Sequence, residues 1–248
     1  MSDALIAETI TITSADGTEI EAYSARALDE APRGGVVVIH HAPGYDDSTK
    51  EIVRRFAAEG YNAVMPNLYH RQAPGASVED AMKAALGGGG ITDEQLADDV
   101  AGGAGYLKGL PNSDGKVGTI GYCSGGRQSF FAATSLELDA AVDCYGAFVT
   151  GTPPENFPIK TMVPIVDRVP SLSCPLLGLF GAKDAHPNPA EVDELEEALK
   201  AAGKTFEFHR YPEAGHSFFT VDRTAYSPEA ATDGWQRILA FYGKYLSA

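Results

Sequence analysis

The segment with the clearest chemical character is Gly-Tyr-Cys-Ser-Gly at residues 121–125, which has Cys123 at its centre. Small residues two positions before and after the central one permit a tight turn between a strand and a helix, which holds the central side chain out over a sheet. The dipole of the new helix would stabilise a thiolate there. The pattern predicts a nucleophile, but free cysteine is also among the most buried residue types, so Cys123 alone leaves a structural role equally open.

Asp184 and His216 supply the partners that a cysteine nucleophile needs. They follow the apolar runs at residues 176–180 and 205–210. A thiol of pKa about 8.5 is little ionised at neutral pH, so an imidazole must take its proton, and a carboxylate must then fix the imidazole tautomer. Singly, Asp184 could cap a loop and His216 could lie on the surface. Because 61 and 32 positions separate the three residues, room remains for strand–helix units between them, and they predict a catalytic triad.

The same chemistry requires donors for the negative oxygen of a tetrahedral intermediate. The backbone amide of Ser124 is one candidate, because it opens the expected helix. The amide of Ala42, just beyond the apolar run at residues 36–39, is the second by analogy with known oxyanion holes.

Apolar patterns predict the elements that must position these residues. Apolar and polar residues alternate in the first two segments, and Asp16 and Gly17 stand between them, which indicates a β-hairpin. Later apolar runs do not alternate with polar residues, which indicates strands covered on both faces of the sheet. The expected strands are residues 6–13, 19–25, 36–39, 61–65, 117–121, 140–144, 176–180 and 205–210. The expected helices are residues 50–59, 93–107 and 124–134, a segment that contains Val192, Leu195 and Leu199, and residues 228–245.

This order of elements predicts an α/β fold in a single domain over residues 1–248, with a mostly parallel central sheet, an antiparallel start and helices on both faces. Ligands bind such sheets at the carboxyl ends of the strands, which the three candidate residues follow. Residues 146–175 are long for a plain connection and are expected to lie over that edge. The polar region between residues 66 and 92 receives no regular element, and residues 87–90 are expected to form a flexible loop tip.

The overall composition excludes several functions. A formal charge of −15 over 248 residues would repel nucleic acid and anionic lipid. No apolar stretch approaches a membrane span, and residues 1–7 lack the features of a signal peptide, so we expect a cytoplasmic protein that binds neither nucleic acid nor membrane. Cys123, Cys144 and Cys174 are too few and too scattered for a disulfide framework or a zinc site, and no histidine pair shares helix spacing with a carboxylate, so no metal is expected.

Three segments resemble the dienelactone hydrolases, or carboxymethylenebutenolidases, of the α/β-hydrolase superfamily. They are PNLYHRQAPG at residues 66–75, DGKVGTIGYCSGG at residues 114–126 and YPEAGHSFF at residues 211–219. The resemblance covers nearly the whole chain and implies the α/β-hydrolase fold, in which the triad follows the order nucleophile, acid, histidine. It also implies a Cys123–His216–Asp184 triad, no metal or organic cofactor, and opening of a small-molecule lactone or ester through a thioester acyl-enzyme.

Two departures from this family concern the substrate. His41 stands where family members with dienelactone activity usually carry a glutamate that helps to gate the thiol. A protonated His41 would favour the Cys123 thiolate, whereas a neutral one could contact substrate, water or backbone instead. Thr220 stands where such enzymes commonly place an arginine for a substrate carboxylate.

Other residues could replace the missing contact or line the pocket. Arg71, Arg127 and Arg223 are candidate replacements for the arginine, and a solvated surface position is favoured for Arg127 and equally open for Arg223. Tyr69, Tyr122 and Tyr145 are expected either to line the substrate pocket or to pack in the core.

Two other classes of function are weighed against hydrolysis. A catalytically weak or inactive ligand-binding module of this fold is the main alternative, against which the intact triad argues. A thiol-redox function would need a second cysteine near Cys123, and neither Cys144 nor Cys174 is close in sequence. We expect a monomer or a small homo-oligomer.

Overall fold

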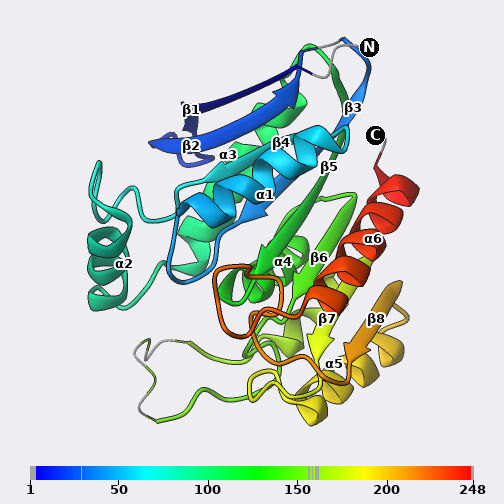
Figure 1. The fold of residues 1–248 in the computed structure, drawn as a ribbon. Coiled ribbons are helices and arrows are strands. Elements are labelled where there is room, and N and C mark those ends of the chain that lie inside the picture. The colour runs from blue at the N-terminus through cyan, green and yellow to red at the C-terminus, as the bar shows by residue number, and fades with distance from the viewer. Residues whose placement is uncertain (1–3, 29, 156, 158, 160–161, 247–248) are drawn as a thin grey trace.

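The computed structural model describes residues 4–28, 30–155, 157, 159 and 162–246. Within these residues eight strands form one sheet in the order β1-β2-β4-β3-β5-β6-β7-β8 (Figure 1). The strands are β1 (Leu5–Thr13), β2 (Glu19–Ala27), β3 (Arg33–Ile39), β4 (Asn62–Pro66), β5 (Ser113–Tyr122), β6 (Ala140–Cys144), β7 (Leu176–Gly181) and β8 (Phe206–Tyr211).

The sheet begins antiparallel and then becomes parallel, as predicted. Strands β1 and β2 form a hairpin in which Ile12 pairs with Ile20. The turn is held by the Thr18 amide, which donates to Asp16 Oδ1 at 2.9 Å, and Gly17 adopts a φ of 87° that glycine tolerates. Strand β2 pairs antiparallel with β4, and every pairing from β4 through β8 is parallel. The parallel strands therefore bring their carboxyl ends to one edge.

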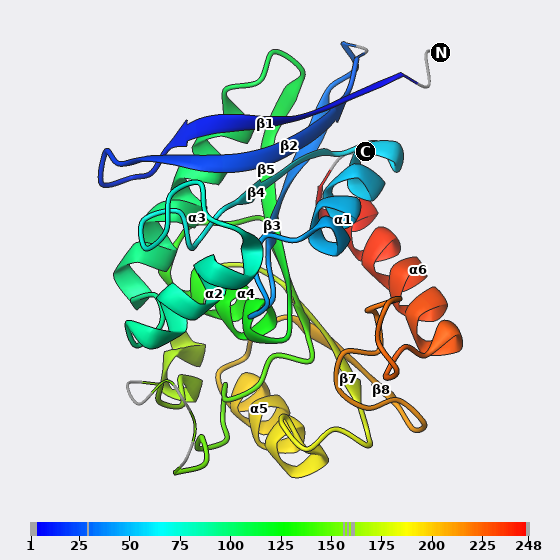
Figure 2. The ribbon, with the colours of Figure 1, turned by 60° about the vertical axis from the view of Figure 1, so that its left-hand side comes forward.

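Helices cover both faces of the sheet (Figures 1 and 2). Residues of α1 (Asp47–Ala58) and α6 (Pro228–Tyr245) belong to one buried cluster, and residues of α2 (Val78–Gly87), α3 (Asp93–Lys108), α4 (Ser124–Ser135) and α5 (Pro189–Ala201) belong to another. A 3₁₀ helix, η1 (Val166–Ser171), lies between β6 and β7 in the chain. Within the described ranges every helix is too short or too polar to traverse a lipid bilayer.

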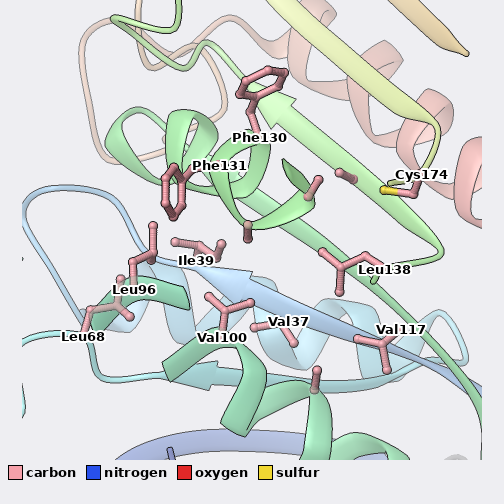
Figure 3. Packing of buried hydrophobic residues seen from close by; sticks show 14 of the residues in the cluster. Val37, Ile39, Leu68, Leu96, Val100, Val117, Phe130, Phe131, Leu138 and Cys174 are labelled. Atoms are coloured by element: carbon pink, nitrogen blue, oxygen red, sulfur yellow. The ribbon is translucent and has the colours of Figure 1, made fainter. Parts of the chain in front are cut away.

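Strand β3 shows why its apolar run does not alternate. Val36 and Val38 belong to the cluster on one face, while Val37 and Ile39 belong to the cluster on the other. Figure 3 shows Val37 and Ile39 among side chains from α3 and α4. A strand covered on both faces requires apolar residues at successive positions.

Helix α2 was not predicted from the sequence. It begins after Ser77, whose hydroxyl accepts a hydrogen bond from the Asp80 amide at 3.2 Å. Its buried residues are Ala81 and Ala85. The apolar residues Val78, Ala81, Met82, Ala85 and Leu86 recur at helical spacing, so the region between residues 66 and 92 is wrongly left without a helix. Residues 88–90 follow α2 as a glycine turn.

The glycines of α3 provide a matched test of packing. A Cβ on Gly102 would lie 2.6 Å from the Thr13 carbonyl oxygen, whereas a Cβ on Gly105 would meet nothing within 4 Å. Gly102→Ala should therefore lower the free energy of unfolding by about 1–3 kcal/mol. Gly105→Ala should raise it by roughly 0.5–1 kcal/mol, because alanine favours the helix. Urea unfolding of both variants measures the difference, and shifts of the same sign would contradict this account.

Candidate active site

The site lies at the carboxyl edge of the parallel strands. Cys123 follows β5, Asp184 follows β7, His216 follows β8, and Ala42 follows β3. Together with Ser124, these residues line one cavity of about 450 Å³. The structure therefore brings together all five residues that the sequence assigns to a triad and an oxyanion hole.

Cys123 occupies a strained turn between β5 and α4. Its φ of 58° and ψ of −122° lie in a region that non-glycine residues rarely adopt. The turn is tight enough that a Cβ on Gly121 would collide with the backbone of Gly125, and a Cβ on Gly125 would collide with the Ile39 carbonyl. Both small residues of the motif are thus required by close backbone contacts.

His216 is held between Asp184 and Cys123. Its Nδ1 lies 2.7 Å from Asp184 Oδ2, and the Cys123 side chain is a second hydrogen-bond partner of the ring, which leaves Nε2 for the thiol. Asp184 is buried, and its Oδ1 accepts a hydrogen bond from the His186 amide at 2.9 Å. Burial of the ring lowers the pKa of His216, but the bonds to Asp184 and Cys123 outweigh this effect and raise the pKa to about 10. Both partners therefore stabilise the charged form of the His216 ring.

The two candidate oxyanion amides are available to a ligand. Ser124 is the first residue of α4, so its amide has no acceptor within the helix. The hydrogen bonds of the described residues do not use the Ala42 amide. Both residues line the cavity that contains Cys123.

The opposite wall of this cavity is apolar. Phe148, Phe157, Ile159 and Met162 contribute to it, together with Leu86 at the end of α2. The prediction that residues 146–175 lie over the carboxyl edge is confirmed for residues 147, 148, 157, 159 and 162, which line the cavity. It is wrong for the last part of the segment, because Arg168 and Ser173 are bonded to the C-terminal end of α4.

Backbone strain gathers around the cavity. In the described part of the chain, Cys123, Tyr145, Phe148 and Ser217 are the non-glycine residues with positive φ. Cys123 and Phe148 line the cavity. The ring of Tyr145 meets the ring of His216 edge-on, with 5.1 Å between the ring centroids. Ser217 directly follows His216 in the chain. Such conformations cost about 1–3 kcal/mol each and persist where the surrounding structure enforces them.

His41 does not line the cavity that contains Cys123. Its Nε2 lies 2.6 Å from Asp46 Oδ2, and its side chain lines a separate cavity of about 350 Å³ that also includes Thr220 and Trp235. The hydrogen bond to His41 helps to lower the pKa of Asp46 to about 2, although burial of Asp46 acts in the opposite direction. An influence of His41 on the thiol stays a prediction.

The three tyrosines have different surroundings. Tyr69 donates its hydroxyl to the Ala42 carbonyl at 2.9 Å and so supports the loop that carries one oxyanion amide. Tyr122 lines the cavity of His41. Tyr145 is buried and packs its ring against His216. All three are buried, and none lines the cavity of Cys123.

Arg71 is not a replacement for the missing arginine. Its guanidinium donates to Asp16 at 2.7 Å and to the buried Asp99 at 2.6 Å, and it also bonds Ser14 and Thr18. These bonds tie the β1–β2 hairpin to α3. The proposed role at the substrate pocket is wrong because the charge of Arg71 is already paired.

The preference for a surface position of Arg127 is also wrong. Arg127 is only 6% exposed and lines the cavity of Cys123. It lies one helical turn after Cys123, a spacing that places two residues on the same face of a helix and could have revealed its position. Arg223 is exposed.

Neither of the other cysteines forms a reactive partner for Cys123. The three cysteines are free. Cys144 lies on β6 next to the elbow, and its carbonyl accepts the Cys123 amide at 3.1 Å, but its side chain is fully buried. Burial raises the pKa of Cys144 well above its usual range. Cys174 packs in the core (Figure 3). Among the described residues no cluster of three or more His, Cys, Asp or Glu side chains is arranged to hold a metal ion.

Asp143 is a buried carboxyl group beneath the elbow that sequence analysis missed. Its Oδ1 accepts the Gly146 amide at 2.7 Å, and its Oδ2 has no hydrogen-bond partner. A Cβ on Gly126 or Gly146 would collide with Oδ1. Burial raises the pKa of Asp143 from 3.8 to about 7, although the bond from Gly146 acts in the opposite direction.

This shift has a defined effect on stability. Because the folded pKa exceeds the unfolded one, the contribution of Asp143 is fully present below pH 3.8 and is lost as pH rises through about 7. At about 1.36 kcal/mol per pKa unit, the loss is roughly 4 kcal/mol. Asp143→Asn keeps the acceptor for Gly146 but does not titrate, so its free energy of unfolding should fall less than that of wild type between pH 4 and 7. Urea unfolding between pH 4 and 7 measures how the free energy of unfolding of each protein depends on pH. The same dependence in both proteins would contradict a raised pKa of Asp143.

The mostly parallel sheet, the strand–helix elbow and the aspartate–histidine pair beside it define the protein as an α/β hydrolase. The dienelactone hydrolase family model matches residues 20–246. A protein of Methylorubrum extorquens (strain AM1), named "Putative carboxymethylenebutenolidase", is 32% identical over 250 residues, covering 98% of this chain and 83% of that protein. A protein of the same name from Escherichia coli (strain K12) is 33% identical over 247 residues, covering 98% of this chain and 89% of that protein.

A solved structure agrees with these relatives. The crystal structure of a Klebsiella pneumoniae protein described as a "Putative Dienelactone Hydrolase" superimposes with a TM-score of 0.85 at 34% identity, covering 98% of this chain and all of the other. The chain belongs to the dienelactone hydrolase family, and its function is that of a hydrolase of this type, acting on a small molecule.

Proposed function

We propose that this protein hydrolyses a small lactone or carboxylic ester through a Cys123–His216–Asp184 triad and a thioester acyl-enzyme, with a dienelactone as the leading substrate. The observation that carries the proposal is the hydrogen-bonded series from Asp184 through His216 to Cys123, beside two available amides at the carboxyl edge of the sheet. Membership of the dienelactone hydrolase family supports the choice of substrate.

The first half of the reaction forms the thioester. His216 holds the thiol proton, and the Cys123 thiolate attacks the carbonyl carbon of the substrate. The carbonyl oxygen becomes an oxyanion that accepts hydrogen bonds from the amides of Ala42 and Ser124. When the intermediate collapses, the C–O bond breaks and the leaving alkoxide takes the proton from His216. In a lactone this alcohol stays attached to the acyl group.

The second half releases the product. Neutral His216 removes a proton from water, and the resulting hydroxide attacks the thioester carbonyl. The second oxyanion uses the same two amides, and its collapse breaks the C–S bond and releases a carboxylic acid. The thiolate and the imidazolium are thereby restored, and Asp184 stabilises the charged ring in both halves.

A quench experiment tests this proposal. A panel of lactones, headed by a dienelactone, and of aryl esters is incubated with the protein, quenched in acid during turnover and digested for mass spectrometry. We expect an acyl group on the Cys123 peptide that is removed by neutral hydroxylamine, and none on the Cys174 peptide. An acyl group on Ser124, or a panel with no turnover, would overturn the proposal.

A further inference from the structure

The peptide group that joins His41 to Ala42 is anchored through its carbonyl oxygen. Two groups contact this oxygen, which belongs to His41: His40 Nδ1 lies 2.9 Å away, and the Gly44 amide donates to it at 2.9 Å. The N–H of the same peptide group belongs to Ala42, and the hydrogen bonds of the described residues do not use it. The C=O and N–H of a trans peptide point in opposite directions. The Ala42 N–H is therefore turned away from His40, and Ala42 lines the cavity that contains Cys123.

Hydrogen bonding fixes the position of the proton on the His40 ring. The Leu68 amide, which can only donate, lies 3.2 Å from Nε2, so Nε2 must be the unprotonated nitrogen. The proton is then on Nδ1, which donates to the His41 carbonyl. His40 is 1% exposed, and burial lowers its pKa to about 4, although the bond to His41 acts in the opposite direction. The ring is therefore a neutral donor with a single tautomer at neutral pH.

The surroundings of His40 hold this donor in place. The ring of Tyr69 meets the ring of His40 edge-on, with 4.9 Å between the ring centroids, and the Tyr69 hydroxyl donates to the Ala42 carbonyl at 2.9 Å. A Cβ on Gly125 would lie 2.9 Å from the His40 carbonyl oxygen, so the backbone after β3 is in close contact with the elbow. The loop that carries the Ala42 amide is thereby fixed against the turn that carries Cys123.

We propose that His40 is a positioning residue whose Nδ1–H orients the His41–Ala42 peptide, so that the Ala42 amide donates to the oxyanion. The inference rests on the proposed function, because it explains how one of the two oxyanion amides is aimed. A bond to the carbonyl also polarises the peptide group and strengthens its N–H as a donor. Oxyanion donors act where charge develops in the transition state, so the effect of His40 belongs to kcat and not to KM.

Two amide side chains at position 40 separate the two hydrogen bonds of the ring. The amide nitrogen of asparagine can take the place of Nδ1, and the amide oxygen of glutamine can take the place of Nε2. In His40→Gln, which loses the donor to His41, kcat for para-nitrophenyl acetate should fall about 10- to 100-fold, with KM within about threefold of wild type. In His40→Asn, which keeps this donor but loses the acceptor for Leu68, kcat should stay within about fivefold of wild type.

The order of the two variants decides between positioning and packing. Equal losses of kcat, or a larger loss in His40→Asn, would show that His40 acts through packing or through Leu68, and would overturn the inference. Nitrogen-15 NMR of the His40 ring in the wild-type protein needs no variant. It should show a neutral ring with the proton on Nδ1 at neutral pH, and a proton on Nε2 would also overturn the inference.

A failure of the proposed function gives a different result. If the wild-type protein hydrolyses no ester or lactone, the proposed function fails, and nitrogen-15 relaxation of the Ala42 amide decides the inference about His40. A lower order parameter of this amide in His40→Gln than in wild type and His40→Asn would support the inference. The same order parameter in all three proteins would overturn it.

Discussion

Replacing Cys123 with alanine should lower kcat for ester hydrolysis by at least about 10³-fold, because it removes the proposed nucleophile. The residual rate should come from the oxyanion amides and substrate binding alone. The variant also lacks the side-chain partner of His216, so the pKa of His216 should fall below about 10. Steady-state kinetics and NMR titration of the His216 ring measure the two effects.

The control for this variant is Cys174→Ala. Cys174 is 8% exposed and lies in the apolar cluster away from the cavity of Cys123. Its replacement should leave kcat close to that of wild type, with a modest loss of stability from the lost volume. Full turnover by Cys123→Ala, or equal losses in the two variants, would remove Cys123 from the mechanism.

Asp184→Asn should lower kcat by about 10²- to 10⁴-fold while leaving the fold intact. The amide has nearly the shape of the carboxylate and can still accept the bond from His186, but it cannot stabilise an imidazolium. Because the bond to Asp184 is a cause of the raised pKa of His216, that pKa should fall in the variant. The leaving group is protonated by imidazolium, so the alkaline limit of activity should move to lower pH.

A pH–rate profile distinguishes this role from simple positioning. Wild-type activity should decline as the pH rises through about 10, and the Asp184→Asn profile should decline earlier. His186→Ala serves as the control, since it keeps the backbone amide that contacts Asp184. An unchanged profile in Asp184→Asn would show that Asp184 does not act on the charge of His216.

The sequence alone predicts most of the sheet and the positions of Cys123, Asp184 and His216, because these depend on local patterns and on strand order. Strand β5 begins at Ser113, four residues before the predicted start, since its first four residues are not apolar. The apolar residues of helix α2 recur at helical spacing, but the helix is short and borders the glycines at residues 87–90, which favour a loop.

Environments that depend on distant residues could not be predicted. The charge of Arg71 is paired with Asp16 and Asp99, which lie 55 and 28 positions away in the chain. Asp143 is unremarkable in the sequence, and only the fold shows that it is buried beside the glycines of the elbow. The burial of Arg127 likewise depends on residues 148 and 163, whose loop has no periodic pattern.

The gathering of left-handed backbone at Cys123, Tyr145, Phe148 and Ser217 has a consequence for engineering heat tolerance. Substituting glycine at these positions would relax the backbone, but at the buried Tyr145 and Phe148 it would also leave cavities that cost about 3–5 kcal/mol, more than the strain relieved. It would also remove or displace the groups that surround the reaction. A more heat-resistant biocatalyst is better sought far from the cavity. The outer surface of α3, where Gly105 leaves unfilled space, is one such place.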